Sequence, residues 1–255
     1  MVKIGFLDSG IGGLTVLKEA LKILPNHEYI YYADTENVPY GIKPKNEVKN
    51  YIFNAVDFII KQGVKAVLIA CNTATSIAIK DLRQQYNIPI IGMEPAVKPA
   101  VENCDGKRVL VLATPLTLKE EKYQKLVSRL DSKDIVDSLP LPELVEFAEN
   151  FVFDEEIITR YLKDKFAPYN LNAYGTIVLG CTHFPFYKSF FREILPAHID
   201  IIDGNLATVK HLKRSIEERY SNINTDSQGK VNFYLSGNKV CEDVVLDKYM
   251  GILKS

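Results

Sequence analysis

Two cysteines in this sequence occupy matching local settings and have the side chains for acid–base or nucleophilic chemistry. Cys71 lies in VLIACNTATS, which starts at Val67, and Cys181 lies in IVLGCTHFPF, which starts at Ile177. In each stretch an apolar run leads through a small residue to the cysteine, and hydroxyl or amide side chains follow. At the start of a helix, backbone N–H groups favour a thiolate. One such cysteine is more often a small buried core residue, but two matching settings predict that both are functional.

Two thiols on opposite sides of one substrate suit the inversion of a carbon that carries hydrogen. One group removes the proton from one face of the carbon, and the other delivers a proton to the opposite face. Because the reverse reaction exchanges these roles, like residues suit the task, and a thiol with a reference pKa of about 8.5 can serve in both. We expect charged neighbours to tune the thiols, with Asp8 beside Cys71, and with Glu146 and His183 beside Cys181.

The other cysteines and histidines do not form a metal-binding pattern. The sequence holds four cysteines and four histidines, and none of them stands in a CxxC or HExxH spacing. We therefore expect no metal site and four reduced thiols. Cys104 and Cys241 lack the setting that Cys71 and Cys181 share, and we expect both to be structural or incidental.

The overall composition is typical of a globular protein. The chain has 255 residues, of which 47% are hydrophobic and 25% charged, and its formal net charge is −1. This charge indicates no nucleic-acid partner and no anionic membrane surface. No run approaches the roughly 20 apolar residues of a membrane span, and Asp8 interrupts the first apolar run too early for a signal peptide. We therefore expect a cytoplasmic protein.

Apolar patterns predict strands and helices that alternate in two successive halves. The expected strands cover residues 3–8, 28–34, 66–70 and 88–93, then 108–114, 175–180 and 199–203, with helices between them. A helix around residues 209–216, a strand at 231–236 and a helix at 244–253 are expected to return to the first half, with a polar loop over 221–230. The prediction is α/β, with two pseudo-symmetric domains of mainly parallel sheets: residues 1–95 and 207–255 in the first, residues 96–206 in the second, and the active site in the cleft between them.

Polar residues follow the expected strands, where ligands bind in open α/β sheets. They are Asp8, Ser9, Gly10, Asp34, Thr35, Cys71, Asn72, Thr73, Thr114, Cys181, Thr182 and His183, and the loop after residue 35 adds Pro39, Tyr40 and Gly41. The two cysteines therefore occupy equivalent places in the two halves.

Several of these residues also have plain structural interpretations. Asn72 or Thr73 can cap the helix that begins there. In TLKE, Thr117 and Glu120 have the spacing of a capping box. The glycines of DSGIGG resemble a phosphate-binding loop but lack the GxGxxG spacing. A tight turn explains them equally, and the loop amides could still hold an anion such as a carboxylate.

Five segments together resemble the glutamate racemase family of the aspartate/glutamate racemase superfamily. They are FLDSGIGGLTVL (6–17), YYADTENVPYG (31–41), ACNTAT (70–75), ELVE (143–146) and LGCTHFP (179–185). The resemblance implies two α/β domains with the active site between them, no metal and no pyridoxal phosphate, and D-glutamate made for bacterial peptidoglycan. It also implies a homodimer.

The same resemblance implies roles for individual residues. Cys71 would act on D-glutamate and Cys181 on L-glutamate, with Asp8, Glu146 and His183 as tuning groups. The residues that match substrate-contacting positions are Ser9, Pro39, Tyr40, Gly41, Asn72, Thr73, Thr114, Thr117 and Thr182. Two departures stand out: ELVE replaces a PLVE-type segment, which leaves Glu143 and Glu149 as alternatives to Glu146, and glycine replaces a family serine in IIDGN.

Three other functions fit part of the pattern. An aspartate or hydantoin racemase would use the same paired thiols. A thiol hydrolase would need only one nucleophile, with Cys181 and His183 as a dyad. A non-catalytic amino-acid-binding module would fit a two-domain cleft but would need no paired cysteines.

Overall fold

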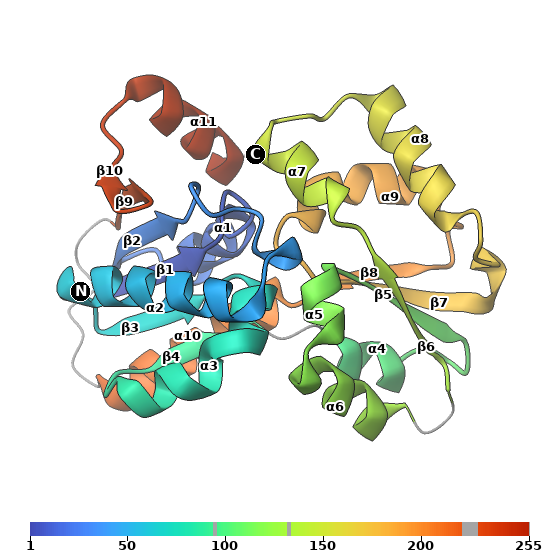
Figure 1. Ribbon diagram of the computed structural model, residues 1–255, viewed down its shortest axis with the longest axis horizontal. Helices are drawn as coiled ribbons and strands as arrows, with labels where there is room; N and C mark the ends of the chain where they lie inside the picture. The colour runs from blue at the N-terminus through green and yellow to red at the C-terminus, as the bar shows by residue number, and fades with distance from the viewer. Residues whose placement is uncertain (94–95, 132–133, 221–228, 255) are drawn as a thin grey trace.

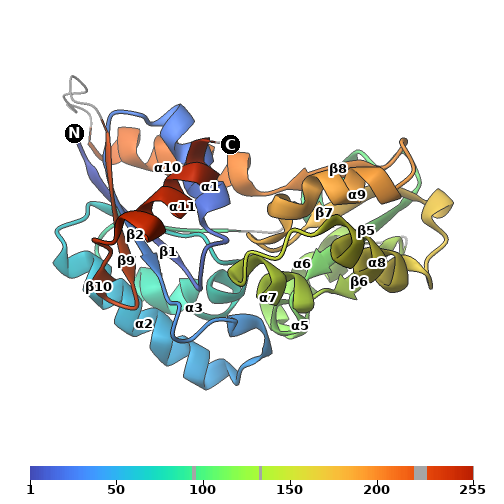
Figure 2. The ribbon, with the colours of Figure 1, turned by 90° about the horizontal axis from the view of Figure 1, so that it is seen from above.

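Two separate β-sheets divide the chain into two halves that lie side by side (Figures 1 and 2). The computed structural model describes residues 1–93, 96–131, 134–220 and 229–254. The first sheet has the strand order β10 (Asn238–Lys239), β9 (Lys230–Leu235), β2 (Glu28–Ala33), β1 (Lys3–Asp8), β3 (Ala66–Ile69) and β4 (Ile90–Gly92). The second has the order β6 (Val136–Pro140), β5 (Arg108–Ala113), β7 (Tyr174–Leu179) and β8 (Asp200–Asp203). Only β10 pairs in antiparallel fashion among these strands, which confirms the predicted α/β class with mainly parallel sheets.

Helices cover both faces of the first sheet because side chains alternate along each strand. Phe6 of β1 packs with the apolar residues of one set of helices, and Leu7 packs with those of the other set. The first set is α1 (Leu14–Ile23), α10 (Asn205–Arg219) and α11 (Asp243–Lys254); the second is α2 (Lys45–Lys61) and α3 (Asn72–Gln85).

The second sheet is covered in the same way. Val111 of β5 packs toward one set of helices and Leu112 toward the other. The first set is α4 (Val97–Glu102) and α6 (Glu121–Leu130); the second is α7 (Glu143–Glu149), α8 (Glu155–Phe166) and α9 (Lys188–Ile194). Three short 3₁₀ turns are η1 (Tyr40–Ile42), η2 (Leu171–Ala173) and η3 (Phe184–Tyr187). Phe6 and Leu112 belong to one buried cluster, so the apolar core is continuous between the two halves.

Residues after 204 return to the first sheet. β9 lies beside β2, and α10 and α11 contact α1. The exact boundaries at 95/96 and 206/207 stay a prediction, and residue 95 lies outside the described residues. So does most of the loop predicted over 221–230. Within the ranges that the structure describes, no helix has the length and apolarity of a membrane span.

Two details of the second half differ from the sequence prediction. The strand β6 was not predicted from the sequence. Its residues, VDSLP, are mostly not buried and end in proline, which an edge strand allows. The predicted capping box of Thr117 and Glu120 was also wrong, because Thr117 lies inside a helix instead of capping one. A short helix, α5 (Pro115–Lys119), begins at a proline, and Thr114 is its cap, with Oγ1 accepting from Thr117 N at 3.3 Å. Proline favours the first helical position because it lacks the N–H that would be unsatisfied there.

Candidate active site

A small cavity between the two halves brings the matching cysteines together. Cys71 follows β3 and Cys181 follows β7, so each thiol lies at the carboxyl end of a buried strand. Both line one cavity of about 10 Å³. The other residues around it are Ser9, Pro39, Tyr40, Gly41, Asn72, Thr73, Thr114, Val145, Thr182 and His183. Except for Val145, all of these were predicted site residues; Asp8, Thr117 and Glu146 were also predicted but do not line the cavity.

A larger cavity lies next to this one and shares Asn72 with it. Its volume is about 350 Å³, and its lining includes Lys80, Lys125 and Arg129. Among the described residues that line it there is no cysteine and no carboxylate. The two cysteines and His183 line the smaller cavity instead.

Cys71 is itself the cap of α3. Its Sγ accepts from Ala74 N at 3.4 Å and lies 4.0 Å from Ser9 Oγ. The prediction that Asn72 or Thr73 caps this helix was therefore wrong. Burial raises the pKa of Cys71 well above its usual value, and the charge of Asp8 adds to the rise. The helix N-terminus does not offset this, so Cys71 is a protonated thiol at neutral pH.

Cys181 has a different neighbour, the buried imidazole of His183. His183 Nδ1 lies 3.7 Å from Cys181 Sγ, and Nε2 lies 2.5 Å from Glu149 Oε1. Burial alone would lower the pKa of His183, but its hydrogen bonds to Cys181 and Glu149 raise that pKa well above its usual value. The imidazolium then donates both of its N–H groups, and it stabilises negative charge on the sulfur.

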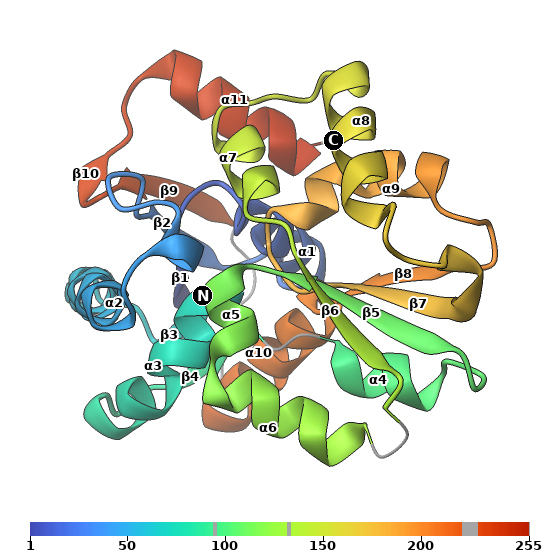
Figure 3. The same cartoon turned by 45° about the vertical axis from the view of Figure 1, so that its right-hand side comes forward.

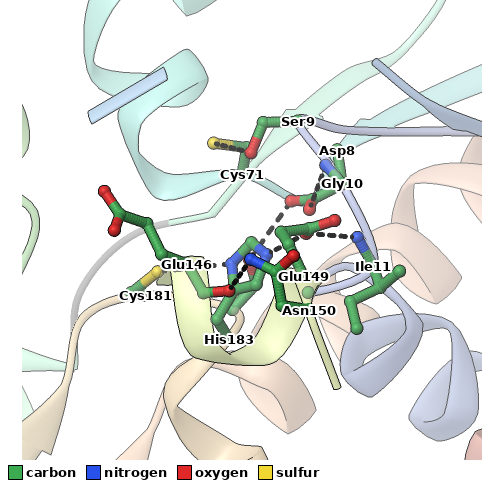
Figure 4. Close-up of polar contacts among 12 residues, drawn as sticks. Asp8, Ser9, Gly10, Ile11, Cys71, Glu146, Glu149, Asn150, Cys181 and His183 are labelled. Carbon is green, nitrogen blue, oxygen red and sulfur yellow. Dashed lines mark hydrogen bonds and ion pairs between the residues drawn. The ribbon is translucent and has the colours of Figure 1, made fainter. Parts of the chain in front are cut away.

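The carboxylate that contacts His183 is Glu149 rather than the predicted Glu146. Figure 4 shows the Glu149 carboxylate between His183 and Ile11, whose backbone N donates to it at 2.8 Å. Glu146 is exposed and its carboxylate points away from His183 (Figure 4). Glu143 instead accepts from Tyr161 and pairs with a lysine.

The spacing along α7 gives the reason. Val145, which lines the cavity, and Glu149 are four positions apart and share one face of the helix. Glu146 follows Val145 directly, so its side chain leaves the helix in a different direction and is exposed. The ELVE motif did not contain this information, but the helical phase of the buried residues in α7 would have indicated Glu149.

Asp8 does not line the cavity, but its hydrogen bond with Thr182 connects the two halves. It is fully buried, and its oxygens accept from Gly10 N at 3.1 Å and Thr182 Oγ1 at 3.2 Å. Burial raises its pKa to about 6, although the positive charge of His183 and the Gly10 N–H oppose the rise. Asp8 is therefore mostly ionised at pH 7 and titrates just below it.

The glycines of DSGIGG permit close approach by groups from the second half. A Cβ at Gly10 would lie 1.9 Å from Glu149 Oε1, and one at Gly12 would lie 2.4 Å from His183 Nδ1. The loop holds a carboxylate, as the sequence allowed, and this carboxylate is the protein's own Glu149.

A cluster of threonine hydroxyl groups joins the halves on the other side of the cavity. Thr73 Oγ1 lies 2.9 Å from the hydroxyl oxygens of both Thr114 and Thr117. Figure 3 shows α5 on the side of the second half that faces the first. Thr117 therefore supports residues of the cavity wall without lining the cavity.

Comparison with known proteins agrees with this geometry. A family model described as Asp/Glu/Hydantoin racemase matches residues 14–212. A glutamate racemase of Halothermothrix orenii is 60% identical over 253 residues, which are 99% of each chain. The solved structure of glutamate racemase isoform RacE1 from Bacillus anthracis has a TM-score of 0.84 at 29% identity, covering 98% of this chain and 94% of that one.

A second solved structure, of the Francisella tularensis glutamate racemase in complex with D-glutamate, has a TM-score of 0.83 at 29% identity. It covers all of this chain and 94% of that one. The extent of these matches in sequence and in structure shows that the chain belongs to the Asp/Glu/hydantoin racemase family.

Proposed function

We propose that this protein interconverts L- and D-glutamate by proton transfer between two thiols and the α-carbon, with no cofactor. The proposal rests on one observation: Cys71 and Cys181, from the strand ends of two different sheets, line one cavity. Relatives that resemble the chain over its full length are glutamate racemases, and one of them is solved with D-glutamate.

The two thiols have unequal surroundings, which suits them to opposite roles: burial keeps Cys71 protonated, and Cys181 faces the His183 imidazolium. The Cys181 thiolate, stabilised by the His183 imidazolium, removes the α-proton of L-glutamate. The Cys71 thiol, kept protonated by burial, delivers its proton to the opposite face of the carbanion. The products are D-glutamate, a Cys71 thiolate and a Cys181 thiol, and the reverse reaction exchanges the roles.

Polar groups around the cavity would hold the substrate. Asn72 Oδ1 is buried and has no hydrogen-bond partner among the described residues, so an acceptor remains for a donor such as an ammonium group. Ser9, Thr73, Thr182 and the backbone of the loop 39–41 supply further polar groups for the two carboxylates.

The resemblance to glutamate racemases also supports a cellular role. We propose that the D-glutamate is used for peptidoglycan, and that the protein acts in the cytoplasm as a homodimer. Size-exclusion chromatography with light scattering tests the dimer, and rescue of a strain that requires D-glutamate tests the role.

One alternative has a specific observation in its favour. The contact of 3.7 Å between Cys181 and His183 would also suit a thiol hydrolase with a single nucleophile. That mechanism would need Cys181 and would be indifferent to Cys71. Aspartate and hydantoins are the alternative substrates within the family, and each belongs in the same assay.

The decisive experiment measures racemisation and α-hydrogen exchange in D₂O for both enantiomers. The wild type should racemise and exchange both without added cofactor. Cys71→Ala and Cys181→Ala should each abolish racemisation. Because each variant keeps one of the two thiols, Cys71→Ala should exchange only L-glutamate, and any exchange by Cys181→Ala should be confined to D-glutamate and rise with pH as Cys71 ionises.

Cys104→Ala is the matched control, because Cys104 is buried but lies outside the cavity. It should racemise like the wild type. A folded wild type that converts neither enantiomer would exclude glutamate racemisation, and a loss seen only with Cys181→Ala would favour the hydrolase.

A further inference from the structure

A buried carboxylate that the proposed reaction does not use lies next to the cavity wall. Asp34 directly follows β2 and is 3% exposed. Its backbone N donates to Asp8 O at 3.1 Å, so the ends of β1 and β2 place the two aspartates on neighbouring strands. The Asp8 side chain accepts from Gly10 N and Thr182 Oγ1, whereas the Asp34 side chain faces the loop of residues 35–41.

Three side-chain donors converge on the Asp34 carboxylate. Tyr40 OH donates to Oδ2 at 2.5 Å, Asn37 Nδ2 lies 3.0 and 3.1 Å from the two oxygens, and Ser236 Oγ donates to Oδ1 at 3.1 Å. Two of these donors come from the 35–41 loop. The third comes from the turn after β9, about two hundred positions later in the chain.

Ser236 also makes a hydrogen bond to the backbone of the same loop. Its Oγ accepts from Glu36 N at 3.0 Å, and its own backbone N donates to Ala33 O at 2.8 Å. Its backbone φ of 44° lies in the left-handed region, which residues other than glycine rarely adopt. The turn after β9 therefore contacts both the end of β2 and the start of the loop.

The end of this loop forms the cavity wall. Tyr40 is 1% exposed, lines the cavity with Cys71, and stacks on Tyr51 with ring centroids 6.3 Å apart. Gly41 packs so closely on the second half that a Cβ there would lie 2.4 Å from Thr114 Cβ. Burial and the charge of Asp34 raise the pKa of Tyr40, so the phenol stays a neutral donor.

We propose that Asp34 is a positioning residue that holds Tyr40 and the 39–41 segment in the geometry that binds substrate, with Ser236 of the C-terminal segment as its second anchor. This inference rests on the proposed function. Asp34 acts through Tyr40 and does not touch the reacting atoms. A charge-assisted hydrogen bond, which is stronger than a neutral one, fixes the phenol and hence the loop.

The test is a double-mutant cycle between Asp34→Ala and Tyr40→Phe, with glutamate racemisation as readout. Each single change should lower kcat/KM by roughly 10- to 100-fold, the cost of breaking a hydrogen bond to a charged group. Asp34→Ala should add little in the Tyr40→Phe background because the two residues act as one unit. Asp34→Asn keeps an acceptor oxygen and should recover part of the activity, and Ser236→Ala should lose less than Asp34→Ala.

The chain offers a matched control in Asp57 of α2, which accepts a hydrogen bond from the OH of Tyr86, the residue after α3. Asp57→Ala breaks the same kind of pair away from the cavity and should leave kcat/KM within roughly 2-fold of the wild type. An equal loss in the control, or additive losses in the cycle, would overturn the proposal.

A second readout does not depend on turnover. Amide hydrogen exchange of residues 35–41, followed by mass spectrometry, should speed up in Asp34→Ala and not in Asp57→Ala. Unchanged exchange would also overturn the inference. A wild type without racemase activity would refute the proposed function, and this exchange measurement would still decide whether Asp34 anchors the loop.

Discussion

At the residue scale, the two thiols have matching positions but unequal surroundings. Cys71 is buried near the negative charge of Asp8, and both effects raise its pKa and keep it protonated. Cys181 faces an imidazolium that Glu149 stabilises from the other side. In the proposed reaction this asymmetry suits Cys71 to deliver a proton and Cys181 to accept one from L-glutamate.

Glu149 rather than Glu146 should support the reaction. Glu149→Gln keeps an acceptor for His183 but removes the negative charge, so we expect kcat to fall by roughly 10- to 100-fold. The same change should lower the pKa of His183, since Glu149 is one of the groups that raise it. Activity requires the imidazolium and is lost as the pH rises through this pKa. The alkaline limb of the pH–rate profile should therefore move to lower pH.

Glu146→Gln is the control for this prediction because Glu146 lies on the same helix and is exposed. Its kcat and pH profile should match those of the wild type. A loss with Glu146→Gln and none with Glu149→Gln would instead favour Glu146, the carboxylate expected from the sequence.

At the element scale, short connections at the strand ends hold groups of the two halves together. The loop after β1 passes so close to α7 and His183 that Gly10 and Gly12 have no room for a side chain. On the other side, the first turn of α3 meets α5 through the threonine hydroxyl groups. The sheets set where these connections begin, and the connections set the distances within the cavity.

Gly12→Ala should damage catalysis more than folding. A Cβ at this position would push against His183 Nδ1 at 2.4 Å, and a displacement of about 1 Å in a catalytic group can cost on the order of 100-fold in rate. We expect kcat to fall by that order while the circular dichroism spectrum stays unchanged.

Gly251→Ala provides the comparison, since a Cβ there meets nothing within 4 Å on α11. Alanine favours helix by up to about 1 kcal/mol over glycine. This variant should melt at the same or a higher temperature and keep full activity. Normal kcat in Gly12→Ala would show that His183 tolerates the shift.

At the scale of the whole molecule, the described conformation is closed. A cavity of about 10 Å³ has room for about one water molecule, far less than glutamate requires. Contacts such as Asp8 with Thr182, and Lys45 with Glu120 at 2.6 Å, join the two halves around it. We therefore expect the halves to separate for substrate entry, and closure then to exclude water from the thiols.

This opening should be visible in the reactivity of the buried thiols. Cys71 and Cys181 should react slowly with a thiol reagent, whereas the exposed Cys241 should react at once, as read by peptide mass spectrometry. Lys45→Ala removes an ion pair between the halves and leaves the buried Glu120 unpaired, so it should speed labelling of both buried thiols several-fold.

Lys49→Ala is the matched control. It removes the pair of Lys49 with Asp81 at 2.5 Å, which joins α2 to α3 within the first half. It should leave the labelling rates unchanged. Equal effects of the two lysine variants would mean that thiol access does not depend on separation of the halves.

The sequence by itself determined the class of fold and, except for Val145, the residues that line the cavity. Strand and helix periods are local properties of the chain, so the β1, β3, β5 and β7 strands could be read directly. The rule that ligands bind at the carboxyl ends of parallel strands then selected Cys71, Thr114 and Cys181, among others. The edge strand β6, with little apolar alternation, was too weakly marked to detect.

Only the tertiary structure decided which groups touch. Glu149 rather than Glu146 meets His183 because the packing of α7 on the core fixes its rotation, and a motif read as letters does not contain that angle. Asp34 meets Ser236 because β9 pairs with β2, which brings together residues about two hundred positions apart. Burial likewise outweighs the effect of the helix N-terminus on the pKa of Cys71, because desolvation depends on every element that surrounds the thiol.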